Sequence, residues 1–195
     1  SCVGCHTREK FGPLIREWRN YFYPTKADLE YVLSLPEYYR ENELETLKKC
    51  DVFHLALEGD CTRPGGISNH GTMHNRVHNL VKGSFCCAST AVNDPLFSVH
   101  HPQVDRILQR WWEIHQPDAD ALPENPTDVA QCRDCTIVGF YPVVRHKDVF
   151  KDSRDLGYYF EHMDFGEDYG KVKPHEVFED REAVKTKPGR PETMN

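Results

Sequence analysis

A group of histidines constrains this chain more than any other feature. His74 and His78 are four positions apart in GTMHNRVHNLVKG, and His100 and His101 follow in NDPLFSVHHPQVDRILQRWW. In a helix, residues i and i+4 lie on one face about 6 Å apart at Cβ, so both imidazoles can face one ion. A third imidazole, from His100 or His101, completes a three-nitrogen site that suits Cu, Zn, Fe or Ni. The sequence therefore predicts two helices that share a metal ion.

The residues around these histidines resemble the second copper-binding region, CuB, of the type-3 copper proteins: tyrosinases, catechol oxidases and molluscan haemocyanins. The resemblance rests on MHNxVHxxxxG and on NDPLFxxHHxxVDRIxxxW. Upstream, FGPLIR, PTKADLEYVLSLPEYY and ALEGD are similar to the animal tyrosinase sequence before CuB, and DLGYYF downstream is similar to the family's closing tyrosine motif. The similarity covers roughly residues 11–165.

The resemblance implies a mainly α fold, built on a CuB-type helix pair with irregular, disulfide-tethered loops and a few short strands. We expect a CuB-like half-domain over residues 1–165. Residues 166–195 lose apolar periodicity, so we expect an extended or mobile tail there. The family's first histidine triplet, CuA, precedes CuB, but the histidines before CuB here have no CuA-like context; they are His6, His54 and His70. The chain therefore resembles the CuB half only.

The resemblance also implies the metal ligands: His74, His78 and His101. The ion it implies is copper, with zinc as an alternative. In the family the second histidine of the HH pair binds the metal, which favours His101 over His100. Pro102 departs from the pattern, because a proline inside a helix removes one backbone donor and can kink the helix at the metal.

Two further positions on the second metal helix have competing interpretations. Phe97, four residues before His101, resembles the bulky gate residue over CuB, although a phenylalanine on an amphipathic helix usually packs in the core. Asp105, four residues after His101, could accept an imidazole N–H, as carboxylates near metal sites often do. Its alternative is an ion pair with Arg106 or Arg110.

Glu58 and Asn75 match positions that, in tyrosinases, hold a water able to take the phenol proton. A carboxylate near a metal-bound phenol is a plausible general base. The alternative for Glu58 is a surface acid at a helix end, and we favour it for a chain without a second copper.

Local patterns predict the remaining elements. Thr25 or Asp28 caps a short helix that runs through residue 35, Pro36 fits the first turn of another, and residues 43–57 have helical spacing. The two metal helices are expected at 72–82, stopped by Gly83, and from a cap at Asn93 or Asp94 to about residue 116. Residues 136–144 predict a strand. The tyrosine motif is expected to pack in the core; it comprises Tyr158, Tyr159 and Phe160.

The eight cysteines are many for 195 residues. Their even number fits up to four disulfides, which indicates an oxidising compartment and secretion. Adjacent Cys86 and Cys87 would each pair elsewhere and tie down the loop between the metal helices. The segment Cys2–His6 fits the CxxCH pattern of haem attachment, but a single such motif is weak evidence and haem is not expected. A Cys₄ zinc site, formed by Cys2 and Cys5 with Cys132 and Cys135, is a further alternative to disulfides. The cysteines are Cys2, Cys5, Cys50, Cys61, Cys86, Cys87, Cys132 and Cys135.

Charge and hydropathy exclude two classes of partner. The formal net charge is −7 with no Lys/Arg cluster, which argues against nucleic acid. No apolar run approaches the ~20 residues that a membrane-spanning helix needs.

Two functional hypotheses remain. The favoured one is a non-catalytic half-domain whose three-histidine site is a structural staple. Where the CuA half is missing, an exposed apolar face would bind a homologous chain or an apolar small molecule such as a pigment or lipid. The alternative is the CuB chain of a split dicopper protein that, with a CuA-bearing partner, oxidises o-diphenols or carries dioxygen. Both predict a homo- or hetero-oligomer.

Overall fold

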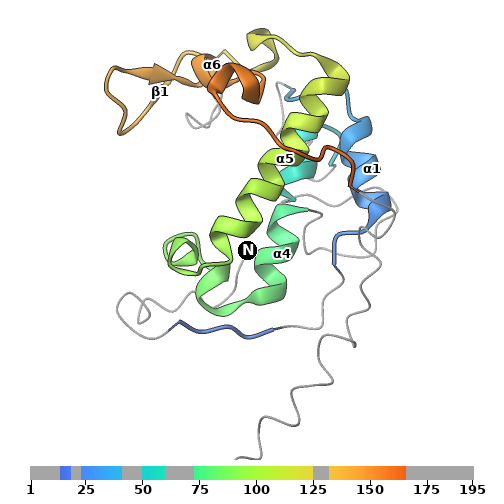
Figure 1. Cartoon of the computed structure of the whole chain (residues 1–195), viewed down its shortest axis with the longest axis vertical. Helices are drawn as coiled ribbons and strands as arrows, with labels where there is room; N and C mark the ends of the chain where they lie inside the picture. Colours follow the sequence, from blue (N-terminus) through green and yellow to red (C-terminus); the bar gives the residue numbers. More distant parts are fainter. Residues whose placement is uncertain (1–13, 19–22, 41–49, 60–72, 125–131, 166–195) are drawn as a thin grey trace, which may run out of the picture.

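The computed structural model of the protein describes residues 14–18, 23–40, 50–59, 73–124 and 132–165. Within these ranges the fold is mainly α, as predicted, and Figure 1 shows the long helix α5 with the shorter helices arranged along it. Among the described residues, no helix combines the length and apolar character needed to cross a bilayer. The α-helices are α1 (Lys26–Ser34), α3 (Phe53–Glu58), α4 (His74–Val81), α5 (Phe97–His115) and α6 (His146–Val149). The 3₁₀ helices are η2 (Gly83–Cys86), η3 (Ala91–Asn93), η4 (Ala119–Ala121) and η6 (Ser153–Leu156), and the strands are β1 (Thr136–Ile137) and β2 (Val144–Arg145).

The core forms where α1 and α3 pack on the C-terminal half of α5. Trp111 of α5 is fully buried and its ring stacks on Phe53 of α3, with centroids 4.4 Å apart. Its indole Nε1 donates to the Leu35 carbonyl at 2.6 Å, so the polar edge of the ring is satisfied. Val32 of α1 and Ile107 of α5 complete the same cluster. Each such buried side chain contributes about 1.5–3 kcal/mol, which anchors α5.

The predicted cap of α1 is confirmed. Thr25 and Asp28 form a capping box in which Thr25 Oγ1 accepts from the Asp28 amide at 3.2 Å and Asp28 Oδ2 accepts from the Thr25 amide at 2.9 Å. The same Asp28 oxygen accepts from Arg76 Nη1 of α4 at 3.1 Å. One carboxylate thus joins the start of α1 to the first metal helix.

The predicted helix after Pro36 is wrong over residues 36–40, which are not helical. Instead, the carbonyls of Glu37 and Tyr38 accept from the amides of Phe53 and His54 at 2.8 and 3.2 Å. These tertiary hydrogen bonds satisfy the first turn of α3, which has no side-chain cap. The predicted helix at 43–57 is observed only as α3, and residues 41–49 lie outside the described ranges.

The predicted continuous strand at 136–144 is also wrong. The segment forms a hairpin, with Thr136 opposite Arg145 and Ile137 opposite Val144. Gly139 has φ +101°, and Pro142 cannot donate to a ladder, so residues 138–143 turn the chain instead of extending it.

The closing tyrosine motif does not pack in the core, contrary to the prediction. The side chains of Tyr158 and Tyr159 are 41% and 75% exposed. The motif follows η6, which ends at Gly157 with φ +89°, and Tyr158 uses its hydroxyl to donate to Asp105 on α5 at 2.8 Å. The motif is therefore held on the surface of α5 by a polar contact.

Disulfides form as predicted among the described cysteines, none of which is free. Cys132 bonds to Cys135, which rules out the alternative zinc site that used both thiols. Cys86 and Cys87, between the metal helices, are each disulfide-bonded. The CxxCH segment and the tail at 166–195 lie outside the described residues.

Candidate metal centre

Helices α4 and α5 lie side by side (Figure 1). Together they bring three imidazoles close to one another. His74 and His78 project from successive turns of α4, and His101 faces them from α5. His74 Nε2 is 2.9 Å from His78 Nε2 and 3.2 Å from His101 Nε2. A tetrahedral ion with M–N bonds of 2.0–2.1 Å holds ligand nitrogens about 3.3 Å apart. Both distances at His74 are therefore close to the spacing that a metal ion requires, and the ligand atoms of all three residues lie within 4.8 Å of one another.

The other ring nitrogen of each imidazole faces an oxygen. His78 Nδ1 lies 2.5 Å from the Phe85 carbonyl, and His101 Nδ1 lies 3.1 Å from the Phe97 carbonyl. Because a carbonyl only accepts, both Nδ1 atoms carry the proton and both Nε2 atoms keep a free lone pair. This tautomer is the one that binds metal through Nε2.

Burial keeps these imidazoles in the neutral form that ligates metal. It lowers the pKa of His78 to about 4 and also lowers the pKa of His101. A metal ion that binds His78 and His101 therefore displaces few protons from these two residues at neutral pH.

His100 does not join the cluster. Its Nε2 lies 3.2 Å from the backbone carbonyl of His74, and its ring stacks parallel to the His74 ring with centroids 5.2 Å apart. Its nitrogen is thus engaged with backbone, whereas the Nε2 of His101 faces His74. Pro102 follows directly, yet α5 continues through it to His115.

Phe97 lies against the three-histidine site and is outside the buried core. Its ring stacks on the His101 ring with centroids 3.7 Å apart, and it is half-buried. It therefore forms an apolar wall beside one ligand.

Glu58, at the end of α3, approaches the site from a third helix. Its Oε2 is 3.2 Å from His74 Nδ1, within ion-pair range but without the alignment of a hydrogen bond. The nearby His74 holds the pKa of the Glu58 carboxyl below its usual value. The side chain is 49% exposed, so solvent and small molecules can reach this carboxylate. Asn75, beside His74, accepts from the Asn79 side chain through its backbone carbonyl at 2.8 Å.

Asp105 takes neither of its predicted partners. Its contact is with the hydroxyl of Tyr158, while Arg106 donates to the Asp164 carbonyl at 2.6 Å and Arg110 pairs with Glu113 at 3.0 Å. Burial raises the pKa of Asp105. No pattern in the sequence indicated that Tyr158 reaches it.

Two supporting groups escaped prediction. The Phe85 carbonyl, which orients His78, is a backbone atom, so its residue type carries no signal. The second is Arg16, within FGPLIR, which forms an ion pair with Asp94 just before α5. The sequence predicted Asp94 as a possible helix cap but gave no sign of its pairing with Arg16. Asp94 does accept from the Leu96 amide at 2.9 Å, although α5 itself begins at Phe97.

Comparison with known proteins agrees with this site. The family model described as "Common central domain of tyrosinase" matches residues 14–114. The chain belongs to the tyrosinase family, as its resemblance to type-3 copper proteins predicted. Tyrosinases use copper, and the three converging imidazoles are suited to bind it.

Individual tyrosinases and a related oxidase are similar to much of this chain. The chain is 34% identical over 142 residues to a tyrosinase of Pelophylax lessonae, covering 72% of this chain and 26% of the relative. It is 32% identical over 179 residues to the tyrosinase of Canis lupus familiaris, covering 84% and 33%. A "5,6-dihydroxyindole-2-carboxylic acid oxidase" of Carassius auratus is 26% identical over 145 residues, covering 71% and 26%. The chain spans about a quarter to a third of the length of these relatives.

Proposed function

We propose that this domain binds one copper ion through His74, His78 and His101 and acts as the CuB side of an o-diphenol oxidase. A segment or chain bearing CuA would complete the oxidase. The observation that carries the proposal is the number of ligands among the described residues. Structural zinc sites usually have four protein ligands, whereas catalytic zinc sites have three and keep one position open. By the same reasoning, a copper ion held by three imidazoles has a position open for a substrate.

The residues around the ligands support a phenolic substrate. Phe97 offers an apolar face at His101, against which an aromatic ring can pack. Glu58, ionised and partly exposed beside His74, is placed to accept the proton of a phenol hydroxyl. Copper would supply the redox chemistry, with dioxygen as the final electron acceptor. Oxidation of an o-diphenol to the o-quinone releases two electrons and two protons, and one Cu(II) accepts a single electron, so a second copper is needed besides the one that these residues would hold.

The test separates metal binding from turnover. The purified chain, loaded with Cu(II), is expected to hold one copper per chain and to oxidise catechol no faster than free copper. Adding a CuA-bearing chain should produce turnover, and Glu58→Gln should reduce it while copper content stays at one. Turnover that is unaffected by Glu58→Gln would remove Glu58 from the mechanism. Absence of turnover in every combination would reject the oxidase.

A second candidate function is that of a non-catalytic domain in which the metal ion only stabilises the fold. One observation favours it. Helix α4 is only eight residues long and lacks a side-chain cap at its start. Helices this short are marginal alone, so an ion that joins α4 to α5 would stabilise the pair. In that case the domain would bind a partner chain or an apolar small molecule such as a pigment or lipid. Copper removal would then lower the melting temperature with no activity to lose.

Secretion is part of the same proposal. The described cysteines are all disulfide-bonded, which fits an oxidising compartment. Recovery of the native protein from the cytosol with reduced cysteines would contradict it.

A further inference from the structure

Phe85 contacts the ligand residue His78 in two ways. The Phe85 ring stacks on the imidazole with centroids 4.2 Å apart and an angle of 20° between the planes. The Phe85 backbone carbonyl accepts a hydrogen bond from His78 Nδ1 at 2.5 Å. The Phe85 side chain is fully buried, so its ring has no solvent to move into. One residue therefore holds the imidazole both at its edge and on its face.

The two contacts restrict different motions of the imidazole. Rotation of a histidine ring about the Cβ–Cγ bond is only weakly restricted by the side chain itself. The hydrogen bond fixes which edge of the ring carries the proton, but it still allows the ring plane to tilt about the Nδ1–O line. A ring packed flat against the imidazole blocks that tilt. Together the contacts direct Nε2 of His78 toward Nε2 of His74, 2.9 Å away.

The backbone that presents Phe85 is itself fixed. The Ser84 amide donates to the Ile15 carbonyl at 2.8 Å, and the Ile15 amide donates to Ser84 Oγ at 3.1 Å. The Ser84 carbonyl accepts from Thr90 Oγ1 at 2.7 Å. The two cysteines that follow Phe85 are both disulfide-bonded. Phe85 is thus held against His78 by a loop with its own tertiary contacts.

The same pair of contacts occurs at a second ligand residue. His101 Nδ1 lies 3.1 Å from the Phe97 carbonyl, and the two rings stack with centroids 3.7 Å apart. The third ligand residue differs, because His74 Nδ1 has no hydrogen-bond partner among the described residues. The orientation of the site before metal binding therefore depends on the two phenylalanines, of which only Phe85 is fully buried.

We propose that Phe85 is a positioning residue for the copper centre: its ring fixes the plane of the His78 imidazole before the metal binds. This inference rests on the proposed binding of copper through His78. Phe85 does not touch the metal and acts only through that ligand. A ligand that is already oriented loses less freedom on binding, so the ring raises the affinity for copper.

Replacing the ring while keeping the carbonyl tests this role. Phe85→Leu removes the stacked ring but leaves the backbone acceptor in place. This variant should bind Cu(II) about tenfold more weakly in competition with a chelator, as is usual when a residue that orients a ligand is lost. It should also show an altered electron paramagnetic resonance spectrum of the bound Cu(II). Phe85→Met, whose flexible side chain fills more of the space, should show the same two changes.

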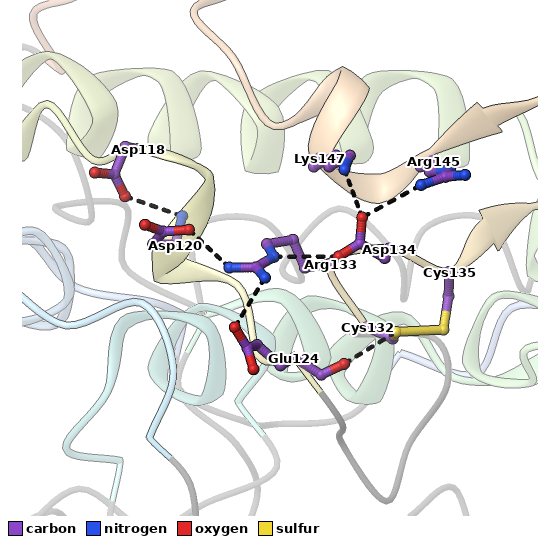
Figure 2. A network of polar contacts seen from close by, with 9 residues as sticks. All are labelled: Asp118, Asp120, Glu124, Cys132, Arg133, Asp134, Cys135, Arg145 and Lys147. Atoms are coloured by element: carbon purple, nitrogen blue, oxygen red, sulfur yellow. Dashed lines mark hydrogen bonds and ion pairs between the residues drawn. A yellow bond between two sulfur atoms is a disulfide. The ribbon is translucent and has the colours of Figure 1, made fainter.

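Two controls separate positioning from a general loss of stability. Phe53→Leu is matched, because Phe53 is also fully buried and its ring stacks on Trp111 at 4.4 Å and 20°. Arg133→Gln breaks the ion pairs of Arg133 with Asp120 and Glu124, in a network that contains no copper ligand (Figure 2). Both controls should keep the affinity and the spectrum of the unaltered chain.

The metal-free protein provides a test that needs no copper. Nuclear magnetic resonance of the unaltered chain should show His78 as a single tautomer protonated at Nδ1, with Overhauser contacts between its ring and the Phe85 ring. Absence of those contacts would overturn the proposal. So would copper affinity and a spectrum that both Phe85 variants preserve, or an equal loss in Phe53→Leu. If the unaltered chain binds no copper, the proposed function fails, and the metal-free spectra still decide the role of Phe85.

Discussion

Arg16 and Asp94 form a bidentate ion pair that ties the N-terminal segment to the connection between the metal helices. Arg16 Nη2 lies 2.6 Å from Asp94 Oδ1, and Arg16 Nε lies 2.9 Å from Oδ2. Asp94 is only 1% exposed, so the pair fixes a buried charge immediately before α5. Next to it, Ile15 and Ser84 exchange hydrogen bonds of 2.8 and 3.1 Å. The segment at residues 14–18 therefore holds the loop whose carbonyl orients His78.

Removing the arginine should destabilise the fold strongly. Arg16→Ala leaves the Asp94 carboxylate buried without its partner, and such a loss costs roughly 3–5 kcal/mol. The expected result is a large fall in the urea midpoint without a change in slope. Arg154→Ala is the control, since its pair with Asp152 lies at the surface and contributes at most about 1 kcal/mol. Equal losses in both variants would contradict the role of burial.

Acid should weaken the same contact. Arg16 holds the pKa of Asp94 below its ordinary value of 3.8. A carboxyl with a lowered folded pKa stabilises the protein above its unfolded pKa and loses that contribution as pH falls through the folded value. The free energy of unfolding should therefore drop below about pH 3.8. The drop should be smaller in Asp94→Asn, which has no carboxylate to protonate. Parallel pH profiles for the two proteins would exclude Asp94 as the cause.

Copper content should distinguish neighbouring histidines. His78→Ala removes one of three converging nitrogens and should reduce bound copper to near zero, as measured by elemental analysis after dialysis. His100→Ala is the matched control, because its Nε2 contacts a backbone carbonyl. This variant should keep one copper per chain. Full occupancy in His78→Ala would reject the ligand assignment.

Gly83 should not tolerate a side chain. It has φ +58°, and a Cβ there would lie 2.1 Å from the Ile15 carbonyl oxygen. Gly83→Ala should therefore destabilise the protein by roughly 2 kcal/mol or more and loosen the segment around Ile15. Thermal unfolding measures the loss of stability. Gly139→Ala is the control, because φ is +101° there but no atom lies within 4 Å of the added Cβ, so this variant has the backbone strain without the steric clash. If both variants lose the same stability, the close approach at Gly83 is not limiting.

The elements that could be predicted from the sequence are those determined by local pattern. The spacing of His74 and His78, the stop at Gly83 and the Thr25 capping box all act within a few residues. The Thr25 box and the two metal helices follow from those local signals.

The elements that could not be predicted depend on distant partners. The segment after Pro36 is not helical because its carbonyls bind α3, and Tyr158 is exposed because its hydroxyl reaches Asp105. Such contacts join residues far apart in the chain, and they override local propensity. The acceptor for His78 is a backbone carbonyl at Phe85, which no choice of side chain reveals.

Asp28 couples the partial unfolding of α1 to that of α4. Its carboxylate closes the capping box with Thr25 and also holds Arg76 on α4. When the first turn of α1 frays, α4 loses that anchor, so the two helices should open as one cooperative unit. Amides of α1, which contains no copper ligand, should consequently exchange with solvent more slowly once copper is bound to the imidazoles of α4.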